Sequence, residues 1–180
     1  MRSLLKFAVI AAFALAGAGS ANAQTATQDI NITATVTKAC TVNNAVSGTP
    51  GTAVIPVSAA GAVTTTAITP TGSPFANVVC NAPSNLQLTS LSGGVVNAAA
   101  AVAGVSKIID DSASATWGGA TATLNTSTVA TAAAAESGPL APIAAANAGS
   151  LSVTITPIAN ALPLIIGAYS DTLRVSIIPQ

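Results

Sequence analysis

Apolar and polar residues alternate along several short stretches of this chain, and this period of two constrains the fold more than any other feature. Successive side chains of a β-strand point to opposite faces, so strict alternation predicts strands with one buried face. The clearest stretches are residues 29–37, 85–89, 151–155 and 169–178; shorter strands are expected at 53–58, 62–68, 75–80 and 105–109. A hairpin is expected at residues 115–124, turning at Gly118 and Gly119.

The region of residues 130–146 contains two Ala-rich stretches, 130–135 and 144–146, without an amphipathic face. Pro139 and Pro142 interrupt this region, so it is expected to be a loop; a helical turn within it is the alternative. No stretch shows a sustained helical period. Short strands separated by turn signals, without helices, predict an all-β fold, and specifically a β-sandwich.

The first 23 residues have the pattern of a secretion signal. Arg2 and Lys6 precede an apolar run at residues 8–16, and Ala21, Asn22 and Ala23 form a small-x-small cleavage site. Cleavage after Ala23 would leave one domain, residues 24–180, with an expected route into the periplasm. An uncleaved membrane anchor is the alternative, although the apolar run is short for a membrane span.

Two cysteines, Cys40 and Cys80, are the only ones in the chain. Export places them in an oxidising compartment, so a disulfide is expected. The bond would close a loop of 41 residues, counting both cysteines, and would stabilise the fold by about 4 kcal/mol in the chain-entropy model. A reactive thiol pair or a metal site is the alternative, but the chain has no CxxC spacing and no histidine.

Composition argues against catalysis and against nucleic-acid binding. With no histidine, acid–base chemistry would depend on a few carboxylates. Asp110 and Asp111 are adjacent, so on a strand they would face opposite sides, and at a turn they would cap and bend the chain. Residues 24–180 carry three basic and five acidic side chains, a net charge of −2, which gives no attraction for nucleic acid. We therefore predict no enzyme, no cofactor and no metal.

Three segments together resemble the archaic chaperone–usher pilins, the group that includes the spore coat protein U domains. The first is the alternating segment of residues 29–36 before Cys40, and the second is the strand that ends at Cys80. The third, at residues 167–177, resembles the Gly-x-Tyr-x-Asp-Thr-Leu-x-Val strand of these subunits. Its motif positions are Tyr169, Asp171, Leu173 and Val175.

The resemblance implies an immunoglobulin-like sandwich that lacks its last strand. A periplasmic chaperone would cover the resulting groove, and an outer-membrane usher would then assemble identical or related subunits into a surface fibre for adhesion and biofilm formation. The chain stops directly after the strand at residues 169–178, as such a fold would require. The expected donor strand, which would fill the groove of a neighbour, presents Ile30, Ile32, Ala34 and Val36 on one face.

Other interpretations of the same residues stay open. The segment at residues 29–37 is alternatively an ordinary first strand packed within its own domain. At the level of function, the alternatives are a monomeric module that binds a glycan or surface ligand, and a secreted array or amyloid-like matrix protein.

Overall fold

The computed structural model describes residue 28, residues 30–128 and residues 135–180. It divides into two units, residues 1–35 and residues 36–180, which we describe separately. In the first unit, the described residues belong to no strand or helix, and their side chains are exposed. The predicted secretion signal, residues 1–23, lies outside the described residues.

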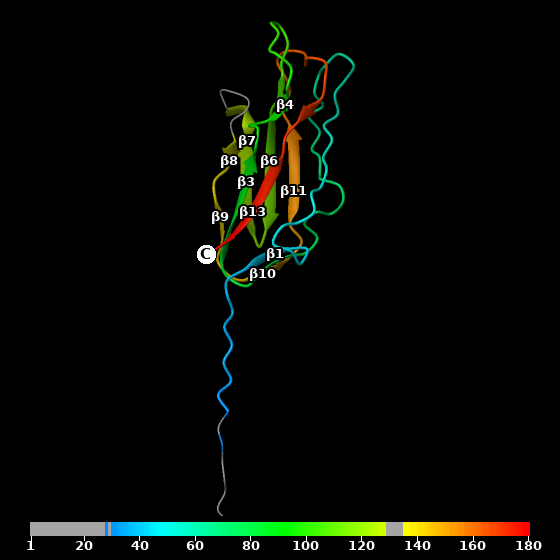
Figure 1. The fold of residues 1–180 in the computed structure, drawn as a ribbon. Helices are drawn as coiled ribbons and strands as arrows, with labels where there is room; N and C mark the ends of the chain where they lie inside the picture. The colour runs from blue at the N-terminus through cyan, green and yellow to red at the C-terminus, as the bar shows by residue number, and fades with distance from the viewer. Residues whose placement is uncertain (1–27, 29, 129–134) are drawn as a thin grey trace, which may run out of the picture. The chain divides into compact units, whose positions relative to one another are not determined.

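The second unit contains two main antiparallel sheets (Figure 1). In one sheet, β3 (Ser84–Ser90) is central. Strand β13 (Leu173–Pro179) pairs with one of its edges, and β8 (Glu136–Ser137) and β9 (Ala141–Ile143) pair with the other. In the other sheet, β6 (Asp111–Trp117) lies between β11 (Ser152–Pro157) and β7 (Ala120–Asn125).

Two small sheets lie at opposite ends of these strands (Figure 1). One consists of β1 (Cys40–Val42), β2 (Val78–Cys80) and β10 (Asn147–Gly149). The other consists of β12 (Tyr169–Ser170), β4 (Val95–Asn97) and β5 (Ile108–Ile109). The described part contains one 3₁₀ helix, η1 (Thr126–Thr128). None of its helices has the length and hydropathy needed to cross a membrane.

The two main sheets pack through the alternating positions of their strands. Leu86 and Leu88 of β3 are completely buried, and Ala113, Ala115 and Trp117 of β6 belong to the same core. The small alanine side chains leave room between the sheets for the leucine and tryptophan side chains. The other buried members of the core are Val78, Cys80, Ala122, Leu124, Ala141, Ile143, Leu151 and Val153. The prediction of an all-β sandwich is confirmed.

The hairpin between β6 and β7 is also confirmed. Trp117 pairs with Ala120 across a two-residue loop. Gly118 and Gly119, the residues of that loop, have φ angles of 58° and 79°. Two successive positive φ angles characterise the type I′ turn, which glycine adopts without the steric cost of a Cβ atom.

Two of the predicted strands are wrong. Residues 53–58 and 62–68 make only isolated bridges, which pair Val57 with Val63 and Ile68 with Ile155. Pro56 has no backbone N–H to donate, and most of these residues are exposed. Alternation alone therefore did not produce a ladder here. The expected strands at residues 75–80 and 105–109 shorten to β2 and β5, whereas β8 and β9 form within the region of residues 130–146, which was expected to be a loop.

The long C-terminal strand expected at residues 169–178 is divided into β12 and β13, which belong to different sheets. The carboxylate of Asp171, between them, accepts a hydrogen bond from Ser90 Oγ at 2.6 Å and another from the backbone N–H of Ser92 at 2.9 Å. These bonds hold the chain at the point where it passes from the small sheet to the large one.

The predicted disulfide is confirmed. Cys40 and Cys80 are bonded to each other and are directly opposite in the antiparallel pair of β1 and β2. Asn81, next to Cys80, accepts a hydrogen bond from the backbone N–H of Ala39 and donates one to the carbonyl of Thr37, each 2.8 Å long. The cystine and this side chain together fix the start of the second unit.

Replacing both Cys40 and Cys80 with alanine should lower the free energy of unfolding by about 4 kcal/mol, because the unfolded chain regains the entropy of the loop. Urea denaturation of the purified protein measures this change. Thr41→Ala, in β1 next to Cys40, is the matched control and should change the free energy by less than about 1 kcal/mol. A double variant as stable as the parent would show that the disulfide does not stabilise the fold.

Candidate functional site

A groove of about 1030 Å³ runs along β13. Residues 46–51, 53–55 and 57 also line it, and side chains of β11 and β5, such as Ile155 and Ile109, contribute to its surface. Figure 1 shows β13 (red) and β11 (orange), which belong to different sheets, near the same side of the sandwich. The groove is therefore an opening into the space between the two sheets, and its lining is mostly apolar.

Strand β13 has only one partner in the described part of the chain, because it pairs with β3 and lies at the edge of its sheet. Its side chains Leu173, Val175 and Ile177 point toward the core but are only half-buried. The equivalent inward side chains of β3, Leu86 and Leu88, are completely buried. The contrast arises because the groove opens beside β13, where both apolar side chains and the backbone edge are accessible.

The segment of residues 46–57 also has little backbone pairing. Its bridges in the described structure are Thr52 with Thr71 and Val57 with Val63. Val46 and Val54 are exposed although they are apolar. Both β13 and this segment therefore present backbone groups that are able to pair with a further strand, as sheet edges do.

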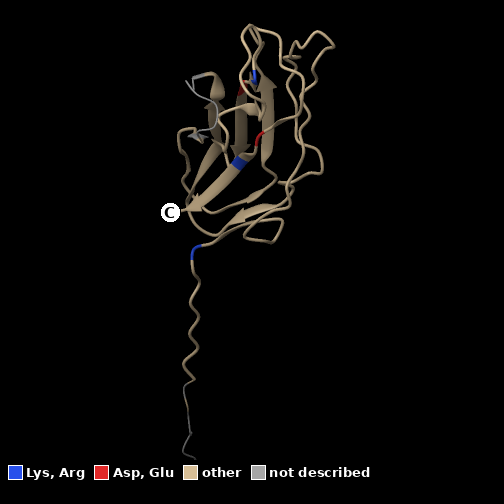
Figure 2. Ribbon diagram, turned by 45° about the horizontal axis from the view of Figure 1, so that its top comes forward, with Lys and Arg blue, Asp and Glu red and all other residues tan. Residues whose placement is uncertain are grey.

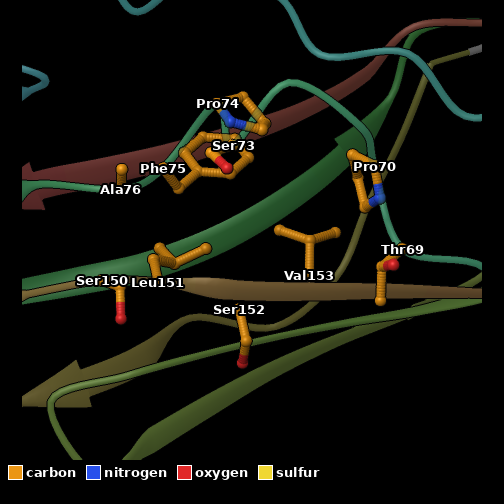
Figure 3. A pocket seen from close by; sticks show the side chains of 10 residues that line it. All are labelled: Thr69, Pro70, Ser73, Pro74, Phe75, Ala76, Ser150, Leu151, Ser152 and Val153. Carbon is orange, nitrogen blue, oxygen red and sulfur yellow. The ribbon is translucent and has the colours of Figure 1, made fainter.

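A smaller hollow of about 400 Å³ shares Pro70, Pro74, Phe75 and Val153 with the groove. Figure 3 shows how β11 contributes to it. Leu151 and Val153 point toward the loop that carries the prolines and Phe75, whereas Ser150 and Ser152 point to the opposite side. The loop at residues 69–76 therefore forms a wall common to both hollows.

One buried carboxyl lines the apolar groove. Asp111 is the first residue of β6, its side chain faces inward, and it is 6% exposed. Its backbone N–H donates a 2.7 Å hydrogen bond to Thr126 Oγ1, but its Oδ1 atom has no hydrogen-bond partner within the described structure. Burial, together with the charges of Asp171 and Asp110, raises the pKa of Asp111 from 3.8 to about 6.

Asp111 was not predicted as a site residue. Asp110 and Asp111 were expected either to cap a turn or to face opposite sides of a strand. The structure places Asp111 in β6, in phase with the inward residues Ala113, Ala115 and Trp117. That alternation was present in the sequence and would have identified Asp111 as an inward-facing carboxyl.

The four residues of the C-terminal motif all line the groove. Leu173 and Val175 supply apolar surface, and Asp171 anchors the loop after β3. The Tyr169 hydroxyl lies 3.0 Å from both the Ser106 and the Ile165 carbonyl oxygens, so it ties two loops together. Cys40 is another lining residue, which places the cystine at the groove.

The predicted donor residues belong to no strand in the described chain. Ile30, Ile32 and Val36 are 83%, 90% and 82% exposed, and Ala34 between them is exposed as well. Large apolar side chains seldom remain this exposed in one contiguous stretch unless they have an interaction partner. The donor role itself stays a prediction.

Comparisons with protein-family models, with curated proteins and with solved structures find no match for this chain. The site consequently defines a class only by its geometry: an all-β sandwich with an apolar groove along an edge strand.

The free energy of unfolding should depend on pH through Asp111. Its pKa in the folded protein is about 6 and its ordinary value is 3.8, so folding favours the protonated form. The resulting stability is fully present below pH 3.8 and is lost as the pH rises through about 6. The loss amounts to at most about 3 kcal/mol, and Asp111→Asn should remove it.

Urea denaturation at a series of pH values tests this expectation. Asp110→Asn changes the adjacent carboxylate and is the matched control, which should keep most of the pH dependence. Identical pH profiles for the parent and Asp111→Asn would show that the Asp111 carboxyl is not destabilised in the folded state.

Proposed function

We propose that this protein is a structural subunit of a surface pilus, assembled by donor-strand complementation. The observation that carries the proposal is the groove beside β13, with half-buried Leu173, Val175 and Ile177 along an edge strand. An added strand in this groove would cover these side chains and pair with the free edge of β13, which is the general mode of strand addition.

The predicted donor segment matches the groove in length and in pattern. β13 has seven residues, and residues 30–36, which begin and end with an apolar residue of the donor face, also number seven. A strand of this length spans roughly 23 Å. Ile30, Ile32 and Val36 would each contribute roughly 1.5–3 kcal/mol on burial. The donor comes from another copy of the chain or from a related subunit.

The same groove requires protection before assembly, because an exposed apolar edge promotes unspecific association. We expect a periplasmic chaperone to cover it after export, and an outer-membrane usher to replace the chaperone with the next subunit. The resulting fibre at the cell surface would serve adhesion and biofilm formation. We propose the chaperone and the usher as partners because the motifs of this chain resemble those of chaperone–usher pilins.

Ile32→Asp tests the donor role. The buried charge should abolish polymers, because an unpaired carboxylate is costly in an apolar groove. The amount of exported, folded monomer should be unchanged, because Ile32 is 90% exposed. Thr33→Asp introduces the same charge one residue along, on the opposite face, and should still polymerise. The readout is the ladder of SDS-resistant, heat-dissociable species on a gel.

A mixing experiment separates this interpretation from a folding defect. Ile32→Asp retains its groove, so it should accept a donor strand from the parent protein and end the growing chain, which shortens the ladder in proportion to the variant added. Loss of folded Ile32→Asp monomer would instead favour an ordinary first strand within its own domain. Parent protein that stays monomeric under all conditions would contradict the pilin proposal.

A further inference from the structure

The apolar groove contains a polar position that an apolar donor strand does not satisfy. Asp111 is 6% exposed, lines the groove, and has an Oδ1 atom without a hydrogen-bond partner in the described structure. A buried carboxylate oxygen without a partner is costly, whereas a protonated carboxyl carries no charge and is buried at a much lower cost.

The charged and titratable groups around Asp111 are few, and Figure 2 shows how sparsely such residues are distributed over the ribbon. Asp110 precedes it on the chain, and Asp171 faces it from the segment ahead of β13; both charges disfavour ionisation of Asp111. Tyr169 of β12 and Arg174 of β13 also line the groove. Arg174 belongs to the exposed, outward set of its strand, so its charge is largely screened by solvent.

The donor segment brings no charge to neutralise Asp111. Between residues 24 and 38 the only charged residues are Asp29 and Lys38, and the donor face itself is apolar. Lys38 lies between Thr37 and Ala39, whose backbone groups are held by the Asn81 side chain at 2.8 Å each. It is thereby fixed to its own domain. Insertion of the donor would remove the remaining water from Asp111 without offering it an ion pair.

We infer that Asp111 takes up a proton from solvent when a donor strand closes the groove, so that subunits link more strongly in mildly acidic solution. This inference rests on the proposed function, because it concerns the regulation of the same groove. In this step the Asp111 carboxylate of the open groove takes one proton from the buffer and becomes a neutral carboxyl in the filled groove.

The expected pH dependence follows from linkage. In the open groove the pKa of Asp111 is about 6, and further burial in the filled groove raises it. Below about pH 6 the carboxyl is already protonated and the affinity should be constant. Above that pH the affinity should fall by up to tenfold per pH unit, about a hundredfold by pH 8.

The experiment uses the full-length mature Ile32→Asp protein, which does not donate but keeps its groove. The probe is a synthetic peptide of residues 24–37, which omits Lys38 and is acetylated and amidated so that its termini do not titrate. Its dissociation constant is measured from about pH 5 to about pH 8, together with the protons taken up on binding, from calorimetry in buffers of different ionisation enthalpy. Asp111→Asn and Asp110→Asn are each added to the Ile32→Asp background.

The inference expects weaker binding with rising pH, uptake approaching one proton per peptide near neutral pH, and a flat profile for Asp111→Asn. Asp110→Asn should keep the dependence, with its midpoint shifted to lower pH. Binding that is independent of pH, or stronger at high pH, would overturn the inference and leave the proposed function standing. A control peptide that carries Ile32→Asp should not bind at any pH. If the parent peptide also failed to bind at every pH, both the inference and the proposed function would be overturned. If Asp111→Asn does not fold, the proton uptake measured with the Ile32→Asp protein, in which Asp111 is intact, still tests the inference.

Discussion

In the described structure, β13 is an edge strand with one unpaired side, and the groove depends on this exposed edge. A strand whose inward side chains are completely covered contributes its full apolar area to folding, but Leu173, Val175 and Ile177 are only half-buried. The apolar area that remains accessible lies beside unpaired backbone groups, so a single added strand would satisfy both. A pocket for a small molecule rarely has this form. Such a pocket is concave and orients its ligand with a few polar groups, whereas β13 offers a row of backbone donors and acceptors.

The remaining parts of the fold keep this groove in place. The cystine joins β1 to β2 at one point of the groove, and Asp171 fixes the loop that leads into β13 at another. The segment of residues 46–57 has almost no ladder of its own, whereas Ile68, further along the chain, pairs with Ile155 of β11. The sandwich and a weakly paired segment therefore form the groove together.

The sequence predicted the elements in which alternation coincides with burial on one face. β3, β11, β13 and the hairpin of β6 and β7 all follow from such patterns, and the disulfide was predicted from two cysteines in a chain that was expected to be exported. Residues 53–58 show the limit: they alternate, but Pro56 and the exposure of the segment prevent a ladder. The division at Asp171 depends on contacts with Ser90 and Ser92, which are about 80 residues distant in the chain, and no local pattern contains that information.

The site was predicted in part, and the part that was missed explains a property of the groove. The motif residues were identified by their pattern, but Asp111 was missed because the hairpin was expected to begin at residue 115, whereas β6 begins at Asp111. An entirely apolar groove would attract any exposed apolar segment. A carboxyl within it would lower the affinity of the open groove for such segments at neutral pH, and its raised pKa costs the folded protein some stability there. In the proposed assembly, Asp111 would therefore set the strength of strand addition, because the apolar burial that drives it would be opposed by the cost of removing a charge from water.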